Sequence, residues 1–250
     1  VDTAKAAGYP LTVPPEKYLS NHKSVGDNEG LWEWLETEAP HAEAAVIATD
    51  SLNYGGLVAS RKHHHLEKYL RGKIVRLDTL HKNNPGLKIY AFSTIMRTPR
   101  QSVASVEPAY YETYGPKIFR LSQLADKEDM EGLTETEELT LSIPANDLKD
   151  WRTRRLVNLQ TNKRLIRMAQ RDGFHFLAIG KDDDAPLSQT HMEARILENL
   201  GNGMNKKQFQ IVPGVDQLGL TLVTRAINEI RGDKPAVYPL FAPGTGGSTV

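Results

Sequence analysis

Short apolar runs rich in β-branched and aromatic residues alternate along the chain with longer segments whose apolar positions recur at helical spacing. These runs are nearly continuous in apolar character, which is typical of parallel strands that are covered on both faces. The pattern therefore predicts βα units around a mainly parallel sheet. The expected strands are residues 42–50 (AEAAVIATD), 87–96 (LKIYAFSTIM), 174–180 (FHFLAIG), 209–214 (FQIVPG) and 236–244 (AVYPLFAPG), with a further candidate at 11–15 (LTVPP).

Helices are expected between these strands. Asp27 is a suitable N-cap for a first helix that carries Leu31, Trp32, Trp34 and Leu35 and closes near Pro40. Longer helices are expected over residues 61–82, over 108–124, and over a segment that runs from Trp151 through Met168. The acidic stretch between the last two, residues 125–138 (ADKEDMEGLTETEE), is expected to be a solvated turn.

The last two helices make an unusually long insertion between two strands. We therefore expect residues 1–100 to form the first βα units, residues 101–172 a helical hairpin that projects from the sheet, and residues 173–250 the remaining βα units of the same domain. The expected fold is a parallel (β/α) barrel-like domain with this helical insertion. A doubly wound open parallel sheet is the alternative, because hydrophobic periodicity does not reveal whether a sheet closes.

Composition narrows the possible partners. Lys and Arg together number 31, as do Asp and Glu, so the net charge attracts neither nucleic acid nor an anionic membrane. No apolar run approaches the roughly 20 residues that a membrane-spanning helix needs. The absence of Cys excludes thiolate chemistry and leaves the cellular compartment open. The expected partner is a small-molecule or glycan substrate that is recognised locally; the sequence specifies neither a cofactor nor an oligomeric state.

Carboxylates follow three of the expected strands, where ligands collect in parallel α/β folds. Asp50 ends the first run, Asp182 and Asp183 follow residues 174–180, and Asp216 follows residues 209–214. Such a group can hold a cation or supply an acid and a base with separated pKa values. Asp is also a common helix cap and turn former, which is the competing interpretation. We take Asp182, Asp183 and Asp216 as catalytic candidates and expect them to share one cleft with Asp50.

Two further segments carry candidate substrate-binding groups. In residues 50–61 (DSLNYGGLVASR), two glycines permit close backbone approach beside Asn53 and Tyr54, and Arg61 near a helix start needs an anionic partner such as Asp50. Arg97 follows the run at 87–96. Later in the chain, Arg154, Asn158 and Asn162 share one helix face, and Asn is unfavourable within helices unless the fold requires its contacts.

Three other patterns are interpreted conservatively. The many arginines around residues 152–171 are balanced by the acidic stretch before them, and no motif supports nucleic-acid binding. The consecutive residues His63, His64 and His65 point to different sides of a chain, so at most one of them need face the site, and we expect them to be surface polar residues. The glycine-rich end of the chain lacks the Lys of a phosphate-binding P-loop.

Several of these stretches together resemble a known family. DSLNYGGLVASR, RTRRLVNLQTNKRLI, GFHFLAIGKDDDAP, HMEARIL and IVPGVDQLGLTLVTR, in this order, resemble the bacterial domain-of-unknown-function family 4127 over almost the whole chain. The resemblance implies that Arg155 joins the substrate-binding candidates. It also implies that this chain lacks an N-terminal strand with an LDDRP-type motif, and we expect both ends to be cuts within a longer protein. Gln217 stands where the family often has Glu, and the family name assigns no activity.

The leading functional hypothesis is a hydrolase that acts through paired carboxylates on a polar, carbohydrate-containing substrate. The adjacent Asp182 and Asp183 also resemble a pair in some retaining hexosaminidases, in which one residue orients a substrate amide and its neighbour protonates the leaving oxygen. The first alternative is a phosphate-ester hydrolase in which Mg²⁺ or Mn²⁺ binds the carboxylates and Arg61 or Arg97 clamps the phosphate. The second is a non-catalytic module that binds a sugar or metabolite.

Overall fold

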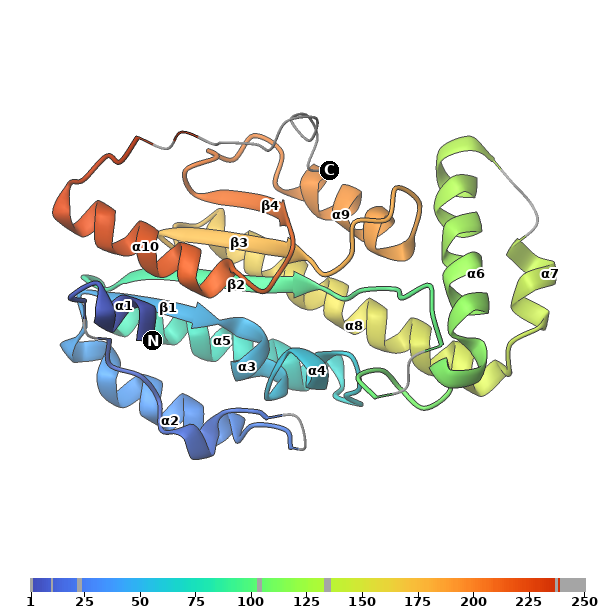
Figure 1. Ribbon diagram of the computed structural model, residues 1–250, viewed down its shortest axis with the longest axis horizontal. Helices are drawn as coiled ribbons and strands as arrows, with labels where there is room; N and C mark the ends of the chain where they lie inside the picture. Colours follow the sequence, from blue (N-terminus) through green and yellow to red (C-terminus); the bar gives the residue numbers. More distant parts are fainter. Residues whose placement is uncertain are drawn as a thin grey trace.

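The computed structural model describes residues 2–9, 11–21, 24–102, 105–132, 136–236 and 238. Figure 1 shows a parallel sheet whose strands alternate with helices along the chain. The strands are β1 (Ala44–Ala48), β2 (Lys88–Ile95), β3 (Phe176–Lys181) and β4 (Phe209–Pro213). The helices are α1 (Asp2–Ala6), α2 (Asn28–Glu38), α3 (Thr49–Tyr54), α4 (Leu57–Ser60), α5 (Glu67–Asn83), α6 (Tyr111–Glu131), α7 (Thr136–Leu141), α8 (Ala145–Ala169), α9 (Gln189–Leu200) and α10 (Leu218–Arg231).

The strand order is β1-β2-β3-β4, and every pair is parallel. The predicted α/β class with a parallel sheet is therefore confirmed, and four of the predicted runs form its strands. The run at 236–244 lies almost wholly outside the described residues. Among the described strands, β1 and β4 each pair on one side only, so this sheet is open and shows no barrel closure.

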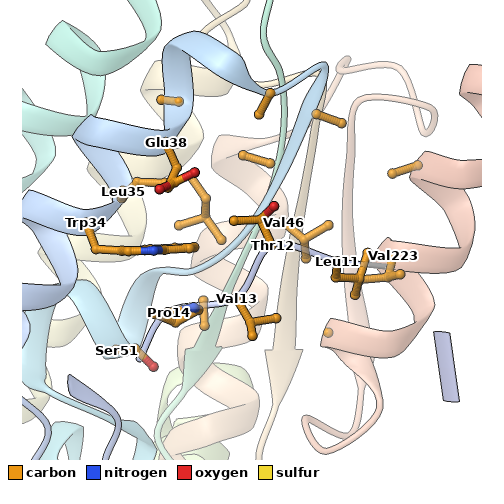
Figure 2. A pocket seen from close by; sticks show the side chains of 18 of the residues that line it. Leu11, Thr12, Val13, Pro14, Trp34, Leu35, Glu38, Val46, Ser51 and Val223 are labelled. Carbon is orange, nitrogen blue, oxygen red and sulfur yellow. The ribbon is translucent and has the colours of Figure 1, made fainter. Parts of the chain in front are cut away.

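The candidate strand at residues 11–15 was predicted wrongly. These residues have no regular secondary structure. Figure 2 shows them beside β1, with Leu11 near Val223 of α10 and Pro14 below Trp34 of α2. Pro14 and Pro15 lack the N–H groups that a ladder of hydrogen bonds requires, which explains why this apolar segment does not extend the sheet.

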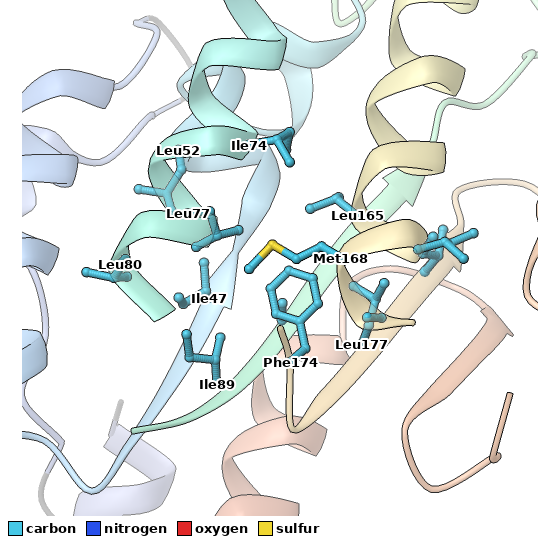
Figure 3. Packing of buried hydrophobic residues seen from close by; sticks show 14 of the residues in the cluster. Ile47, Leu52, Ile74, Leu77, Leu80, Ile89, Leu165, Met168, Phe174 and Leu177 are labelled. Carbon is cyan, nitrogen blue, oxygen red and sulfur yellow. The ribbon is translucent and has the colours of Figure 1, made fainter. Parts of the chain in front are cut away.

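Side chains alternate between the two faces of the sheet and build two separate cores. The larger core contains Ile47, Ile89 and Leu177 from the strands, packed against α5, α8 and α9 (Figure 3). The smaller core contains Tyr90 and Phe176 on the opposite face, packed against α10. Helices α5, α8 and α9, one from each connection between consecutive strands, therefore cover one face, and α10 packs on the other.

Helix α2 begins at its predicted cap, whereas α6 extends past its predicted end at residue 124. The side chain of Asp27 caps α2 by accepting a hydrogen bond from the Gly30 N–H at 3.0 Å, as predicted. The acidic stretch, by contrast, is not a solvated turn. Helix α6 continues through it to Glu131, because the buried Asp126 pairs with the partly exposed Arg195, and α7 forms from the residues after 135.

Only part of the long insertion between β2 and β3 packs on the sheet. Helix α8 packs along β2 and β3, whereas α6 and α7 stand past the carboxyl ends of the strands, where α6 contacts α9 (Figure 1). The division of the chain at residues 100 and 172 stays a prediction. Among the described helices, none is long and apolar enough to cross a membrane.

Candidate functional site

Asp50 lies at the carboxyl end of β1, in the first turn of α3, and its side chain is buried. Its Oδ2 accepts a hydrogen bond from the Thr94 hydroxyl at 2.6 Å, and Ser93 Oγ lies 3.5 Å from its Oδ1. The pKa of Asp50 is raised to about 7, chiefly by burial and also by the negative charge of Asp182, against the opposing effect of the Thr94 hydrogen bond. Asp50 thus carries a proton over part of the physiological pH range.

Asp182 follows β3 and is held by Arg61. Its Oδ2 accepts from Arg61 Nη2 at 2.6 Å and from Arg61 Nε at 3.1 Å, and both side chains are more than nine-tenths buried. Arg61 also lies 3.7 Å from Glu107, which in turn accepts from Arg97 Nε at 2.7 Å. Burial raises the pKa of Glu107. Asp182, Arg61, Glu107 and Arg97 thus form a largely buried chain of alternating charge, and Asp50 lies close enough to Asp182 for the two carboxyl groups to interact electrostatically. We call these five residues the carboxylate–arginine network.

Asp183 points away from this network. Its Oδ2 accepts from the Thr98 N–H at 2.6 Å and from the Thr190 hydroxyl at 3.0 Å, and its Oδ1 accepts from the Ala185 N–H at 3.2 Å. These bonds tie the loop after β3 to the end of β2 and the start of α9. The geometry gives Asp183 the environment of a structural acceptor.

Asp216 is exposed and lies after β4, where none of the contacts among the described residues joins it to Asp50 or Asp182. It lines an open cavity of about 490 Å³ beside the start of α10, together with Val212, Gln217 and Arg225. The structure thus brings Asp50 and Asp182 close to each other at one edge of the sheet, whereas Asp216 lines a cavity that includes neither of them.

The polar stripe of α8 is buried and is bonded to the neighbouring loops. Arg154 Nε donates to the His63 carbonyl at 2.8 Å, Asn158 Nδ2 to the Ser60 carbonyl at 2.9 Å, and Asn162 Nδ2 to the Thr94 carbonyl at 2.9 Å. These bonds fix the segment after α4 and the end of β2, which carry the partners of Asp182 and Asp50. The polar stripe of α8 therefore holds in place the two segments that contact Asp50 and Asp182.

Arg155 is buried beside the stripe and uses all five of its donors. It pairs with both oxygens of Glu193 and donates to the carbonyls of Met96 and Arg97 and to the Thr98 hydroxyl. Such complete internal satisfaction leaves no donor for a ligand. Arg155 therefore holds the loop after β2 and does not face a substrate in this arrangement.

The remaining candidates, Asn53 and Tyr54, lie at the end of α3, the helix that begins beside Asp50. Tyr54 is buried, and burial raises the pKa of its hydroxyl. Asn53 is also buried, and its Nδ2 has no hydrogen-bond partner among the described residues. Gly55 and Gly56 both adopt positive φ (84° and 136°), a conformation that favours glycine and lets the chain turn between α3 and α4.

His63 was wrongly expected at the surface. Its ring is buried and stacks on Tyr54 with ring centroids 4.7 Å apart. Nδ1 accepts from the His65 N–H at 3.0 Å, so Nε2 carries the proton and donates to Asn158 Oδ1 at 2.7 Å. Burial lowers the pKa of His63 to about 4, so the ring is neutral at neutral pH.

Sequence reasoning missed Glu107 and Glu193, the buried partners of the site arginines. Glu107 lies in the poorly patterned segment before α6, and Glu193 lies on an ordinary amphipathic helix, so neither follows a strand. The only signal was indirect: if the candidate arginines are buried, each needs an acidic partner, and the sequence does not say which acid supplies it. Among the described residues, no group of three or more His, Asp or Glu side chains is arranged to hold a metal ion.

Fold and site together define the class of protein: an α/β protein with an open parallel sheet whose carboxyl edge holds a buried carboxylate–arginine network. The chain belongs to the family described as "Protein of unknown function (DUF4127)", which matches residues 1–250. The resemblance inferred from the motifs is thereby confirmed, but this match gives no support to the expectation of missing terminal parts. No curated protein and no solved structure matches the chain.

Proposed function

We propose that the protein is a hydrolase in which Asp50 is the general acid and Asp182 its ionised partner. The observation that carries the proposal is the unequal environment of the two carboxylates: the pKa of Asp50 rises to about 7, whereas Asp182 is ion-paired with Arg61. Acid–base hydrolysis near neutral pH commonly uses two carboxyl groups, one protonated and one ionised. This assignment replaces Asp183 and Asp216 as the leading catalytic candidates.

The chemistry requires one proton donor and one proton acceptor. Asp50 gives its proton to the leaving oxygen as the bond from that oxygen to the reacting carbon breaks. A water oxygen forms the new bond to the same carbon, and its proton passes to the ionised Asp182. The net result is addition of one water across the broken bond, with both carboxyl groups returned to their starting states by proton exchange with solvent.

A carbohydrate-containing substrate remains the proposed class, and a glycosidic bond its target. Glycoside hydrolysis relies on two carboxyl groups of unequal protonation and requires no metal in most families. The phosphate-ester alternative relies on free arginine donors, but Arg61 and Arg97 are already paired with Asp182 and Glu107. No specific observation therefore favours that alternative. The barrel-like fold also stays a proposal. Its one support is that consecutive strands are neighbours in the order β1 to β4, as they are in (β/α) barrels.

The test is hydrolysis of a panel of oligosaccharides and of paired alkyl and dinitrophenyl glycosides. Alkyl leaving groups need a proton and dinitrophenolate does not, so Asp50→Asn should lower turnover of alkyl glycosides by about 10² or more and of dinitrophenyl glycosides far less. Asp184→Asn is the matched control, because Asp184 is half-buried in the same loop and pairs with Lys181.

Two results would overturn the proposal. One is an equal loss for both leaving groups in Asp50→Asn, which would indicate a structural role for Asp50. The other is the absence of hydrolysis anywhere in the panel by the unaltered protein, which would exclude the carbohydrate class. An activity that a chelator abolishes would instead favour metal-dependent chemistry.

A further inference from the structure

The free edge of β1 has backbone groups available for pairing. Lys88 N–H donates to the Glu43 carbonyl at 3.1 Å, so the alternation of a parallel ladder turns residues 43, 45 and 47 toward β2. Ala44 and Val46 then direct their N–H and C=O groups to the opposite side, where the described residues contain no paired strand. Strand edges of this kind, uncharged and without proline, are templates for another strand.

This edge is recessed within an apolar groove of about 690 Å³. All five residues of β1 line it, with Trp34 and Leu35 of α2 on one wall and Val223 and Ile227 of α10 on the other. Figure 2 shows these walls facing each other across β1, with residues 11–14 crossing between them. An inserted strand would meet apolar side chains on both of its faces, as the central strands of the sheet do.

The groove also has a charged end. Glu38 and Glu43 line it near the start of β1, and Ser51 lies at its other end, just after the strand. Within the described residues, neither Glu38 nor Glu43 makes an ion pair. The end of the groove next to the start of β1 therefore favours a cationic residue.

We propose that the groove is a β-augmentation site that takes an extended segment of another polypeptide, with apolar residues along its length and a cationic residue at one end. Backbone pairing with Ala44 and Val46 supplies the main contacts, and the two apolar walls select the side chains. A small apolar molecule would leave these backbone groups unpaired in an apolar groove, which is unfavourable. This site is independent of the proposed acid–base pair.

A second copy of this chain fits the groove poorly. Edge-to-edge pairing of two copies requires both β1 edges to meet, but each is recessed between α2 and α10. A free extended segment has no such walls of its own. The charge of Glu38 and Glu43 argues in the same direction, because two copies would bring four carboxylates to one small interface.

The test uses fluorescein-labelled Lys-Val-Ile-Val-Ile-Val-Lys and fluorescence anisotropy with the full chain. Two further peptides carry N-methyl groups on two alternate residues each, one at both Ile positions and the other at the last two Val positions. Because a strand turns alternate N–H groups toward its neighbour, one pattern should weaken binding at least tenfold and the other should leave it nearly unchanged. Simple apolar adsorption does not distinguish the two patterns.

Protein variants locate the binding site. Val223→Trp fills the groove and should weaken binding at least tenfold, whereas Val75→Trp, at an exposed position of α5, should not. Joint Glu38→Gln and Glu43→Gln changes should weaken binding several-fold, and less at high salt. Thermal melting of each variant checks that it folds. Equal effects of the two N-methylation patterns would overturn the proposal, as would a dimer that Val223→Trp dissociates and that binds no peptide.

Discussion

At the scale of single residues, the buried acid Asp50 couples stability to pH. Burial raises its pKa to about 7 in the folded protein, so between pH 4 and 7 the unfolded chain loses this proton while the folded protein keeps it. The free energy of unfolding attributable to Asp50 therefore falls as pH rises through that window, by up to about 4 kcal/mol.

Asp50→Asn should remove this pH dependence. We expect the variant to be at least as stable as the unaltered protein at pH 7.5, and to lose its advantage at pH 4.5, in urea unfolding followed by circular dichroism. A variant that is less stable at both pH values would show that the Thr94 hydrogen bond, and not the proton, dominates at this position.

His63 couples stability to pH with the opposite sign. Its pKa is lowered to about 4 in the folded protein. As pH falls below about 6.5, His63 therefore becomes protonated in the unfolded chain but stays neutral in the folded protein. The stability that His63 contributes is complete above pH 6.5 and is lost as pH falls toward 4, by about 3 kcal/mol.

His63→Gln should flatten this acid loss, because glutamine does not titrate and still offers an amide donor to Asn158. The measurement is the difference in unfolding free energy between pH 7 and pH 4.5, compared with that of the unaltered protein. His64→Gln is the matched control: His64 is 79% exposed, so the same substitution there should leave the difference unchanged. Equal slopes for all three proteins would refute the prediction.

At the scale of elements, one buried ion pair joins α8 to α9. Glu193→Gln removes the carboxylate beside Arg155, whose guanidinium stays buried, and should destabilise the protein by about 3–5 kcal/mol. The same change at the more exposed Glu67, which pairs with Arg164, should cost at most about 1 kcal/mol. Chemical denaturation of the two variants compares them directly; similar costs would mean that water reaches the Arg155 pair.

The elements that the sequence predicted well are those decided by local chemistry. The apolar runs 42–50 and 174–180 became β1 and β3, and Asp27 caps α2, because strand burial and capping depend on nearby residues. Helix α6 ran past its predicted end because Asp126 bonds to His191 and Arg195, about 65 residues further along. No local pattern contains that information.

The residues of the candidate site were likewise predicted only in part. The rule that ligands collect at strand ends found Asp50 and Asp182, but it could not separate Asp182 from Asp183, which differ only in the direction of their side chains. It also could not show that the N–H groups of Arg155 are all bonded to Glu193 and to the loop after β2. These distinctions depend on contacts between distant parts of the chain.

At the scale of the whole molecule, the two faces of the sheet are packed to different extents. Leu165 lies in the large core between the sheet and α8, whereas Leu222 of α10 also lines the open cavity beside β4. Leu165→Ala should cost about 2–5 kcal/mol, and Leu222→Ala less, because side chains next to a cavity can move to fill the space. Urea denaturation of the two variants measures the difference, and a larger cost for Leu222→Ala would contradict this account.

The strand order also affects how the sheet can form during protein synthesis. Each strand pairs with the one synthesised before it, so the sheet can grow as the chain leaves the ribosome. Helix α10, which covers Tyr90 and Phe176, is the last of the described helices and follows β2 by roughly 120 residues. At about 5–20 residues per second, that face of β2 stays bare for about 6–24 seconds. A nascent chain of this protein therefore exposes this apolar surface for several seconds before α10 can cover it.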